Sequence, residues 1–208
     1  MKEKLRDTRN LYFIGGSSCC GKSTIASMLQ KEYGFVYFKL DEYTGDYIEK
    51  GASLGLEPML KISKMNYDEL YLGRTVEEQV EDELNFYKES FEFFLEDLEN
   101  LEGENIIIEG SNVTPDFANE YGFKLYVALV PTKKFQLDNF EKREWVQEIM
   151  GKCSNRQQAY YNLMERDIQL ALEFIEQAEQ NKKPYILVDG KKSIEQVYKE
   201  VKKIFKLS

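Results

Sequence analysis

A glycine-rich segment near the start of the chain combines residue types that bind phosphate. It fits the pattern G-x-x-x-x-G-K-[ST] at every position. In that pattern the glycines let backbone N–H groups turn inward, the lysine reaches the β- and γ-phosphates, and the hydroxyl completes a magnesium shell. The sequence therefore predicts a nucleotide-binding loop, with Ser23 as a magnesium ligand and Lys22 on the phosphates. The residues of this phosphate loop are Gly16, Ser17, Ser18, Cys19, Cys20, Gly21, Lys22, Ser23 and Thr24.

The sequence on either side supplies the elements that such a loop needs. The apolar run 11–14 predicts a strand before it, and the segment from Lys22 places Ile25, Met28 and Leu29 on one helical face. A helix N-terminus carries partial positive charge, which favours bound phosphate. The sequence thus predicts a strand, the phosphate loop and a helix that begins at about Lys22.

Two acids stand where predicted strands end. Asp41 follows the apolar run 35–38, and Glu109 closes the run 104–108. Ligands of open α/β sheets bind at the carboxyl ends of the strands, so both side chains are predicted to face the phosphate loop. For Asp41, a structural role at a turn or helix cap remains the alternative.

Five apolar runs alternate with amphipathic stretches along the whole chain. The runs are 11–14, 35–38, 104–108, 123–130 and 184–188, and the longest amphipathic stretch is 75–100. Crossovers between parallel strands require helices, so the pattern predicts an α/β fold: one three-layer α/β/α domain over 1–208 with a five-stranded parallel sheet. Segment 44–74 has weak periodicity and is interpreted as a mobile, acceptor-binding segment.

The composition excludes several classes of function. Apolar residues make up 42% of the 208 residues and charged residues 31%, as in globular proteins, and the absence of His removes imidazole chemistry. The net charge of −9 disfavours nucleic acid and anionic membranes as partners.

No apolar run is long enough for a membrane span, and the charged start MKEKLRDTRN is unlike a secretion signal, so we expect a cytoplasmic protein. It could be a monomer or a homodimer.

The negative charge is concentrated in one part of the chain. Residues 77–109 hold 13 acids and one lysine, a net of −12, whereas the rest of the chain carries +3. The acidity therefore does not argue against a phosphate site elsewhere.

The three cysteines match neither a disulfide framework nor zinc-ligand spacing. Two of them, Cys19 and Cys20, lie in the phosphate loop, where a field that holds phosphate is expected to lower a thiol pKa. Reduced, inert thiols are the favoured interpretation, and a redox switch is the alternative.

The segment GGSSCCGKST after LYFIG, with IIIEG as third strand, resembles the small P-loop kinase group. That group includes nucleoside monophosphate, shikimate and gluconate kinases and antibiotic phosphotransferases. The resemblance implies a P-loop NTPase fold with sheet order 2-3-1-4-5 and ATP with Mg²⁺ as cofactors. It also implies a mobile lid before the last strand, matched here by 133–158.

The resemblance also implies roles for individual residues. Asp41 would contact the acceptor hydroxyl as a base or orienting group, and Glu109 would hold a magnesium-bound water. Arg143 and Arg156 would close over the phosphates from the lid, with solvated helix charges as the alternative reading. Gly190 lies in the loop that packs adenine in such kinases. Two further arginines are weaker candidates for binding phosphate or an anionic acceptor: Arg74 and Arg166.

These residues predict an ATP-dependent kinase that transfers the γ-phosphoryl group to a hydroxyl or phosphate of a small-molecule acceptor. One alternative is a P-loop NTPase or switch that hydrolyses nucleotide to drive a partner. Another is a non-catalytic nucleotide-binding interaction protein whose acidic helix docks a basic partner. The identity of the acceptor is not encoded in any motif.

Overall fold

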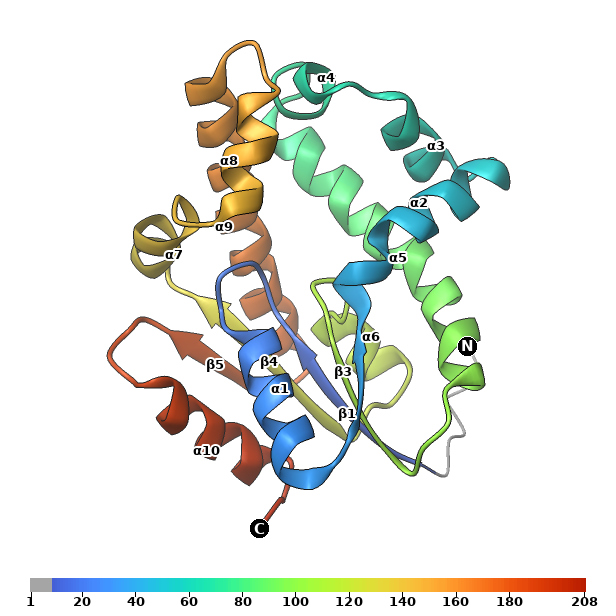
Figure 1. Ribbon diagram of the computed structural model, residues 1–208, viewed down its shortest axis with the longest axis vertical. Coiled ribbons are helices and arrows are strands. Elements are labelled where there is room, and N and C mark those ends of the chain that lie inside the picture. The colour runs from blue at the N-terminus through green and yellow to red at the C-terminus, as the bar shows by residue number, and fades with distance from the viewer. Residues whose placement is uncertain (1–8) are drawn as a thin grey trace.

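A parallel five-stranded sheet forms the centre of the molecule (Figure 1). The computed structural model describes residues 9–208, so most of the charged start, residues 1–8, lies outside the described residues. The strand order is β2-β3-β1-β4-β5, and every neighbouring pair is parallel. The predicted sheet and its order 2-3-1-4-5 are therefore confirmed. The strands are β1 (Asn10–Gly15), β2 (Val36–Lys39), β3 (Asn105–Glu109), β4 (Leu125–Pro131) and β5 (Tyr185–Val188).

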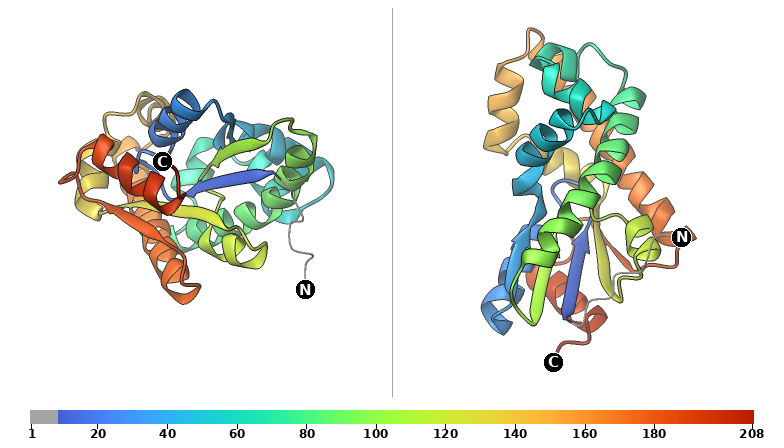
Figure 2. Two further views of the ribbon diagram at one scale, coloured as in Figure 1. Left: turned by 90° about the horizontal axis from the view of Figure 1, so that it is seen from below. Right: turned by 90° about the vertical axis from the view of Figure 1, so that its right-hand side faces the viewer.

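Helices cover both faces of this sheet, as Figure 2 shows in two further views. One face carries α1 (Lys22–Tyr33) and α10 (Ile194–Ile204), and the other carries α5 (Val76–Asn100), α6 (Pro115–Glu120) and α9 (Arg156–Gln180). Successive side chains of a strand point to opposite faces, so Ile107 packs with the first group and Ile108 with the second. The predicted three-layer α/β/α architecture is confirmed.

Capping signals in the sequence set the helix boundaries. Thr75 and Ser193 each form a capping box that begins α5 and α10, and Thr114 caps α6 ahead of Pro115. Gly34 ends α1 with a φ of 70°, a left-handed conformation that glycine adopts without strain. The helix boundaries therefore determine the positions of the loops that join the helices to the strand ends.

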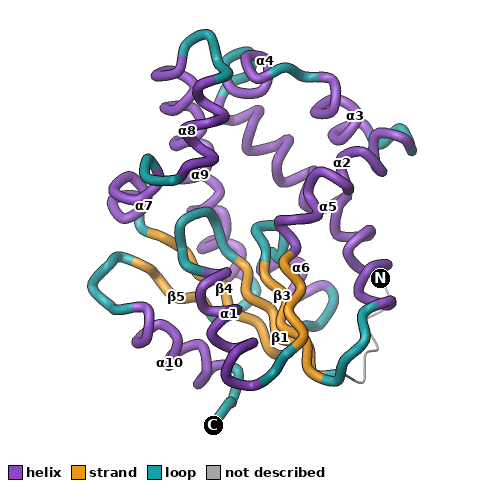
Figure 3. The backbone as a smooth tube through the Cα atoms, in the orientation of Figure 1, coloured by secondary structure: helices purple, strands orange, loops and turns teal. Residues whose placement is uncertain are grey.

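A layer of short helices lies beyond the carboxyl ends of the strands (Figure 3). Segment 44–74 is helical there, contrary to the weak periodicity of its sequence, because helices of one to three turns present few repeating apolar positions. The layer consists of η1 (Leu40–Tyr43), α2 (Thr44–Ser53), α3 (Glu57–Lys64), α4 (Tyr67–Tyr71), α7 (Lys133–Phe140) and α8 (Glu144–Gly151).

The two segments that were predicted to bind the acceptor and to form the lid pack against each other in this layer. Phe140, Val146 and Met150 of α7 and α8 form a buried cluster with the start of α9, and Tyr67 and Tyr71 of α4 pack against it. Segments 44–74 and 133–158 thus cover the carboxyl edge of the sheet together. The mobility predicted for both remains a prediction.

Candidate functional site

The phosphate loop connects β1 to α1 with a backbone that only glycine fits at its start. Gly16 has a φ of +127°, and a Cβ built there would stand 1.9 Å from the carbonyl oxygen of Leu129. Gly21, with a φ of 86°, leads directly into α1, and no side chain caps the first turn of that helix. The free N–H groups of this turn are therefore placed for an anion.

A cavity of about 450 Å³ lies over the loop and the first turn of α1. Residues 18–24 of the predicted phosphate loop all line it, and Gly16 and Ser17 lie outside its lining. Asp41, Ser111 and Arg143 line the opposite side. We call this space the phosphate cavity.

Lys22 is the buried cation of the phosphate cavity. Its side chain lies over the loop, where Nζ donates to the Ser17 carbonyl oxygen at 3.1 Å and to the Ser111 hydroxyl at 3.4 Å. Burial acts to lower the pKa of Lys22, but the nearby Cys20, Asp41 and Glu109 outweigh it, so the pKa is raised. The ammonium therefore stays charged at neutral pH, as a phosphate ligand requires.

Glu109 lies beneath the loop at the end of β3 and is fully buried. Its Oε1 accepts a hydrogen bond of 2.8 Å from the Tyr37 hydroxyl, whereas its Oε2 has no hydrogen-bond partner within residues 9–208. A buried carboxylate oxygen without a donor is costly unless a cation or water satisfies it. Together with the hydroxyl of Ser23, which lines the cavity, this donor set fits a Mg²⁺ ion that takes its other ligands from phosphate and water.

A second cavity, of about 540 Å³, adjoins the first, and we call it the acceptor cavity. The two share Ser18, Asp41, Ser111 and Trp145 in their linings. Its other walls come mainly from the short helices, α5 and α9, and half of their lining residues are apolar or aromatic. These side chains are Ile48, Ile62, Leu70, Tyr71, Phe86, Tyr87, Ile149 and Leu170.

The four arginines that the sequence singled out lie in different places. Arg143 lines the phosphate cavity, whereas Arg156 is exposed, hydrogen-bonds to Gln147 and lines a separate surface depression. Arg74 and Arg166 line the acceptor cavity, each already paired with an acid. The structure therefore brings one of the two predicted lid arginines to the phosphate loop.

Gly190 has a φ of +81°, and a Cβ built there would stand 3.0 Å from the Phe135 ring. The loop after β5 thus packs against α7, at one side of the phosphate cavity rather than in its lining. The adenine role of Gly190 remains a prediction.

The prediction that the loop lowers thiol pKa values is wrong. Burial raises the pKa of Cys19, against the opposing effect of Arg143, and burial also raises the pKa of Cys20. Cys20 Sγ donates to the Ser17 carbonyl oxygen at 2.9 Å, so this thiol holds the loop in shape. Desolvation outweighs the favourable field here.

Sequence reasoning missed several polar side chains of the acceptor cavity, among them Asn112 and Asp167. Asp167 falls on the face of α9 that also carries the buried Met164 and Ala171, and a charge on an apolar helix face is a signal that could have identified it. Asn112 follows β3 within three residues of Glu109, at the same sheet edge.

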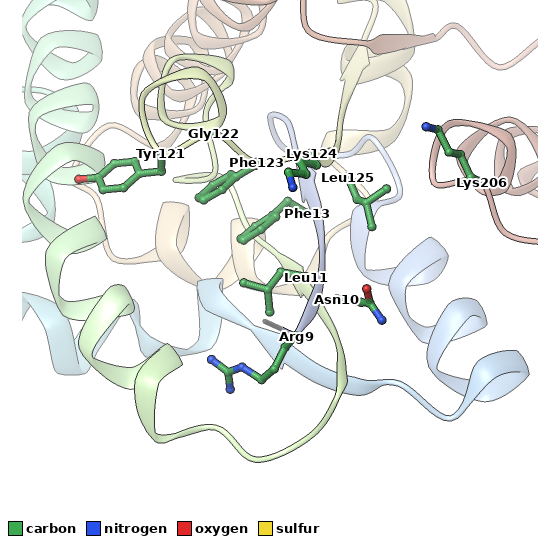
Figure 4. Close-up of a pocket in the computed structure, with 10 residues that line it drawn as sticks. All are labelled: Arg9, Asn10, Leu11, Phe13, Tyr121, Gly122, Phe123, Lys124, Leu125 and Lys206. Atoms are coloured by element: carbon green, nitrogen blue, oxygen red, sulfur yellow. The ribbon is translucent and has the colours of Figure 1, made fainter. Parts of the chain in front are cut away.

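A third cavity, of about 420 Å³, lies at the opposite edge of the sheet (Figure 4). It is lined by residues at the starts of β1 and β4, including the stacked rings of Phe13 and Phe123, 3.8 Å apart. It is remote from the strand-terminal acids, so we place the functional site at the carboxyl edge.

Comparisons with known proteins bear on the fold alone. No protein-family model and no curated protein matches the sequence. Among solved structures, TT1252 from Thermus thermophilus is 14% identical with a TM-score of 0.55, over 96% of this chain and 98% of that one. Deoxyadenosine kinase from M. mycoides with bound dATP is 19% identical with a TM-score of 0.49, over 94% and 99% of the two chains. Shikimate kinase from Bacteroides thetaiotaomicron is 15% identical with a TM-score of 0.49, over 95% and 99%.

Within residues 9–208, no helix is both long and apolar enough to span a bilayer. The sequence resemblance implied two features that the structure contains. One is the glycine-rich loop between β1 and α1, and the other is the strand order β2-β3-β1-β4-β5. The likeness to TT1252 agrees with this three-layer α/β fold and its strand order.

Proposed function

We propose that this protein is a kinase that transfers the γ-phosphoryl group of ATP to a hydroxyl group of a small acceptor. One observation carries the proposal: the phosphate cavity and the acceptor cavity adjoin, and Asp41 lines both. An acid at such a junction can contact an acceptor hydroxyl while the phosphoryl group lies over Lys22. Phosphoryl transfer depends on this kind of positioning more than on covalent help from the protein.

The residues of the phosphate cavity supply the remaining parts. The phosphates lie against the N–H groups of the loop and of the first turn of α1, with Lys22 on the β- and γ-phosphates. Ser23 would ligate Mg²⁺, and Glu109, buried beside the cavity, would hold one of its waters; the ion would neutralise charge on the phosphates. Arg143 faces the same space and offsets the charge that develops on the transferred group.

Asp41 orients the acceptor and receives its proton. Its side chain is exposed at the junction, and among residues 9–208 its Oδ1 alone is engaged, by the N–H of Ser111. Oδ2 is therefore available for the acceptor hydroxyl.

The short helices partly cover this junction, and they would exclude water from it if they closed further over bound substrates. Trp145 of α8 lines both cavities, and the packing of α4 against α7 and α8 closes the space above it. Exclusion of water favours transfer to the acceptor over hydrolysis of ATP.

The test is a screen of small hydroxyl compounds for acceptor-dependent release of ADP, with wild type and Lys22→Ala side by side. We expect turnover only with acceptor, and loss of at least about a hundredfold in rate in the variant. Lys31→Ala, on the exposed end of the same helix, is the matched control and should keep full activity. Equal rates in wild type and Lys22→Ala would overturn the proposal.

The same assay separates the two alternatives. A hydrolytic switch would release phosphate from ATP at full rate without any acceptor. A non-catalytic nucleotide-binding protein would bind ATP and release no ADP under any condition of the screen.

A further inference from the structure

The acceptor cavity has an excess of acid, and its cations are already engaged. Four acids and two arginines line it. Arg74 donates to Asp82 at 2.6 Å, and Arg166 donates to Asp167 at 2.7 Å with Glu83 at 3.6 Å. An anionic acceptor would compete with these acids for the arginines, of whose buried nitrogens Arg74 Nε lacks a hydrogen-bond partner within residues 9–208.

Two buried hydrogen-bond acceptors in the same cavity have no donor. Asp167 is 2% exposed and Asn112 is 4% exposed. Oδ2 of Asp167 and Oδ1 of Asn112 lack a hydrogen-bond partner within the described chain. The orientation of the Asn112 amide follows from its neighbours, because Nδ2 donates to Ser90 Oγ, which itself donates to the Tyr87 carbonyl oxygen. Unsatisfied buried acceptors in a cavity call for a ligand that donates.

Of these two oxygens, Asn112 Oδ1 lies close to the carboxylate of Asp41. Asn112 Oδ1 and Asp41 Oδ1 stand 3.0 and 3.2 Å from one point, the place where a Cβ on Gly110 would be. Glu83 lies within electrostatic reach of Asp41 and Asp167, and burial raises its pKa, so a nearby positive charge would stabilise its ionised form. The wall of the cavity between Asp41 and α9 therefore carries hydrogen-bond acceptors and negative charge.

We propose that the acceptor is a hydroxylated amine, a small cation that carries both the hydroxyl to be phosphorylated and a protonated amino group. This proposal rests on the proposed kinase function and names its substrate class. The ammonium donates to Asp167 Oδ2 beside Glu83, and hydroxyl groups donate to Asn112 and Asp41. The aromatic wall, with Tyr71, Phe86, Tyr87 and Trp145, holds the apolar body of the molecule.

The experiment compares compounds that share a carbon skeleton and carry a cationic, a neutral or an anionic group, at one carbon in the first triplet and at different ring positions in the second. One triplet is 2-amino-1-phenylethanol, 1-phenyl-1,2-ethanediol and mandelate, and the other is glucosamine, glucose and glucuronate. Binding is measured without nucleotide, from the fluorescence of Trp145, the single tryptophan of the chain, which lines the cavity. We expect the amine of at least one triplet to bind about tenfold or more tightly than its carboxylate analogue.

Variants connect this discrimination to the acids. Asp167→Asn keeps Oδ1 for Arg166 but removes the charge, so it should weaken amine binding about tenfold and change binding of the neutral compound little. Glu83 is less buried than Asp167, and Glu83→Gln should also weaken amine binding. It replaces Asp167→Asn in the experiment if that variant does not fold. The control Asp138→Asn lies on the exposed face of α7, paired with Lys134, and should change nothing.

The outcomes separate this proposal from the kinase function. ATP binding, measured in parallel, tests the phosphate cavity, and it should be lost in Lys22→Ala while amine binding persists. Carboxylates that bind as well as the amines, or a failure of both amines to bind a protein that still binds ATP, would overturn the hydroxylated-amine proposal and leave the kinase proposal standing. Amine selectivity that survives both Asp167→Asn and Glu83→Gln would also overturn it.

Discussion

The carboxylate of Asp41 accepts a hydrogen bond of 2.8 Å from the backbone N–H of Ser111, although 70 positions separate the two residues in the chain. Asp41 follows β2 and Ser111 follows β3, and these strands are neighbours in the sheet. The topology thus fixes the acid at the junction of the two cavities, where the phosphoryl group would pass in the proposed reaction.

Replacing Asp41 tests its role at this junction. Asp41→Asn retains Oδ1 for the Ser111 N–H, so the fold should be preserved, while kcat should fall by about a hundredfold because proton transfer and orientation are lost. The measurement is steady-state ADP release together with thermal unfolding. Glu42→Gln, the exposed neighbour paired with Lys39, should keep wild-type kcat. An unchanged kcat in Asp41→Asn would leave only a structural role for this residue.

Glu109 should control the magnesium requirement. In Glu109→Gln the Tyr37 hydrogen bond can remain, but the charge facing the metal is removed, so the Mg²⁺ concentration for half-maximal activity should rise about 10- to 100-fold. A magnesium titration of ATP turnover measures this shift. Glu104→Gln, exposed just before the same strand, is the control and should not shift the curve. Superimposable titrations for Glu109→Gln and wild type would contradict the metal role.

The two lid arginines should differ in their contribution. Arg143 lines the phosphate cavity, so Arg143→Ala should lower kcat at least about tenfold by removing charge stabilisation from the transition state. Arg156→Ala should stay close to wild type, because its guanidinium contacts Gln147 at the surface. Both variants are compared in the same turnover assay. If kcat falls further in Arg156→Ala than in Arg143→Ala, the lid must adopt a different arrangement during catalysis from the one described above.

The loop thiols should react slowly at neutral pH. Burial raises the pKa of Cys19 and Cys20, so the reactive thiolate is scarce until the pH exceeds the ordinary thiol pKa. Alkylation by iodoacetamide at pH 7, followed by mass spectrometry, should be slower in the native protein than in the denatured chain, and it should accelerate as the pH is raised. Native labelling of Cys19 that outpaces the denatured chain would instead support a redox role.

Much of the fold could be predicted because its signals are local. The glycine spacing of the phosphate loop, the caps at Thr75, Thr114 and Ser193, and the apolar runs of the strands each depend on a few neighbouring residues. Segment 44–74 could not be predicted in the same way, because its helices are too short for a periodic pattern and depend on packing against α5 and α9.

For the site, the sequence by itself determined the phosphate loop and the two strand-terminal acids, Asp41 and Glu109, because motif and strand position place them at one sheet edge. Only the tertiary structure decided which arginine faces the loop, since Arg143 and Arg156 are equivalent as sequence signals and differ in where the starts of α8 and α9 lie. It also decided the charge of the acceptor cavity, where Glu83 and Asp167 come from different helices. Burial raises the pKa of the loop thiols, and the burial of a side chain is determined only by the folded structure.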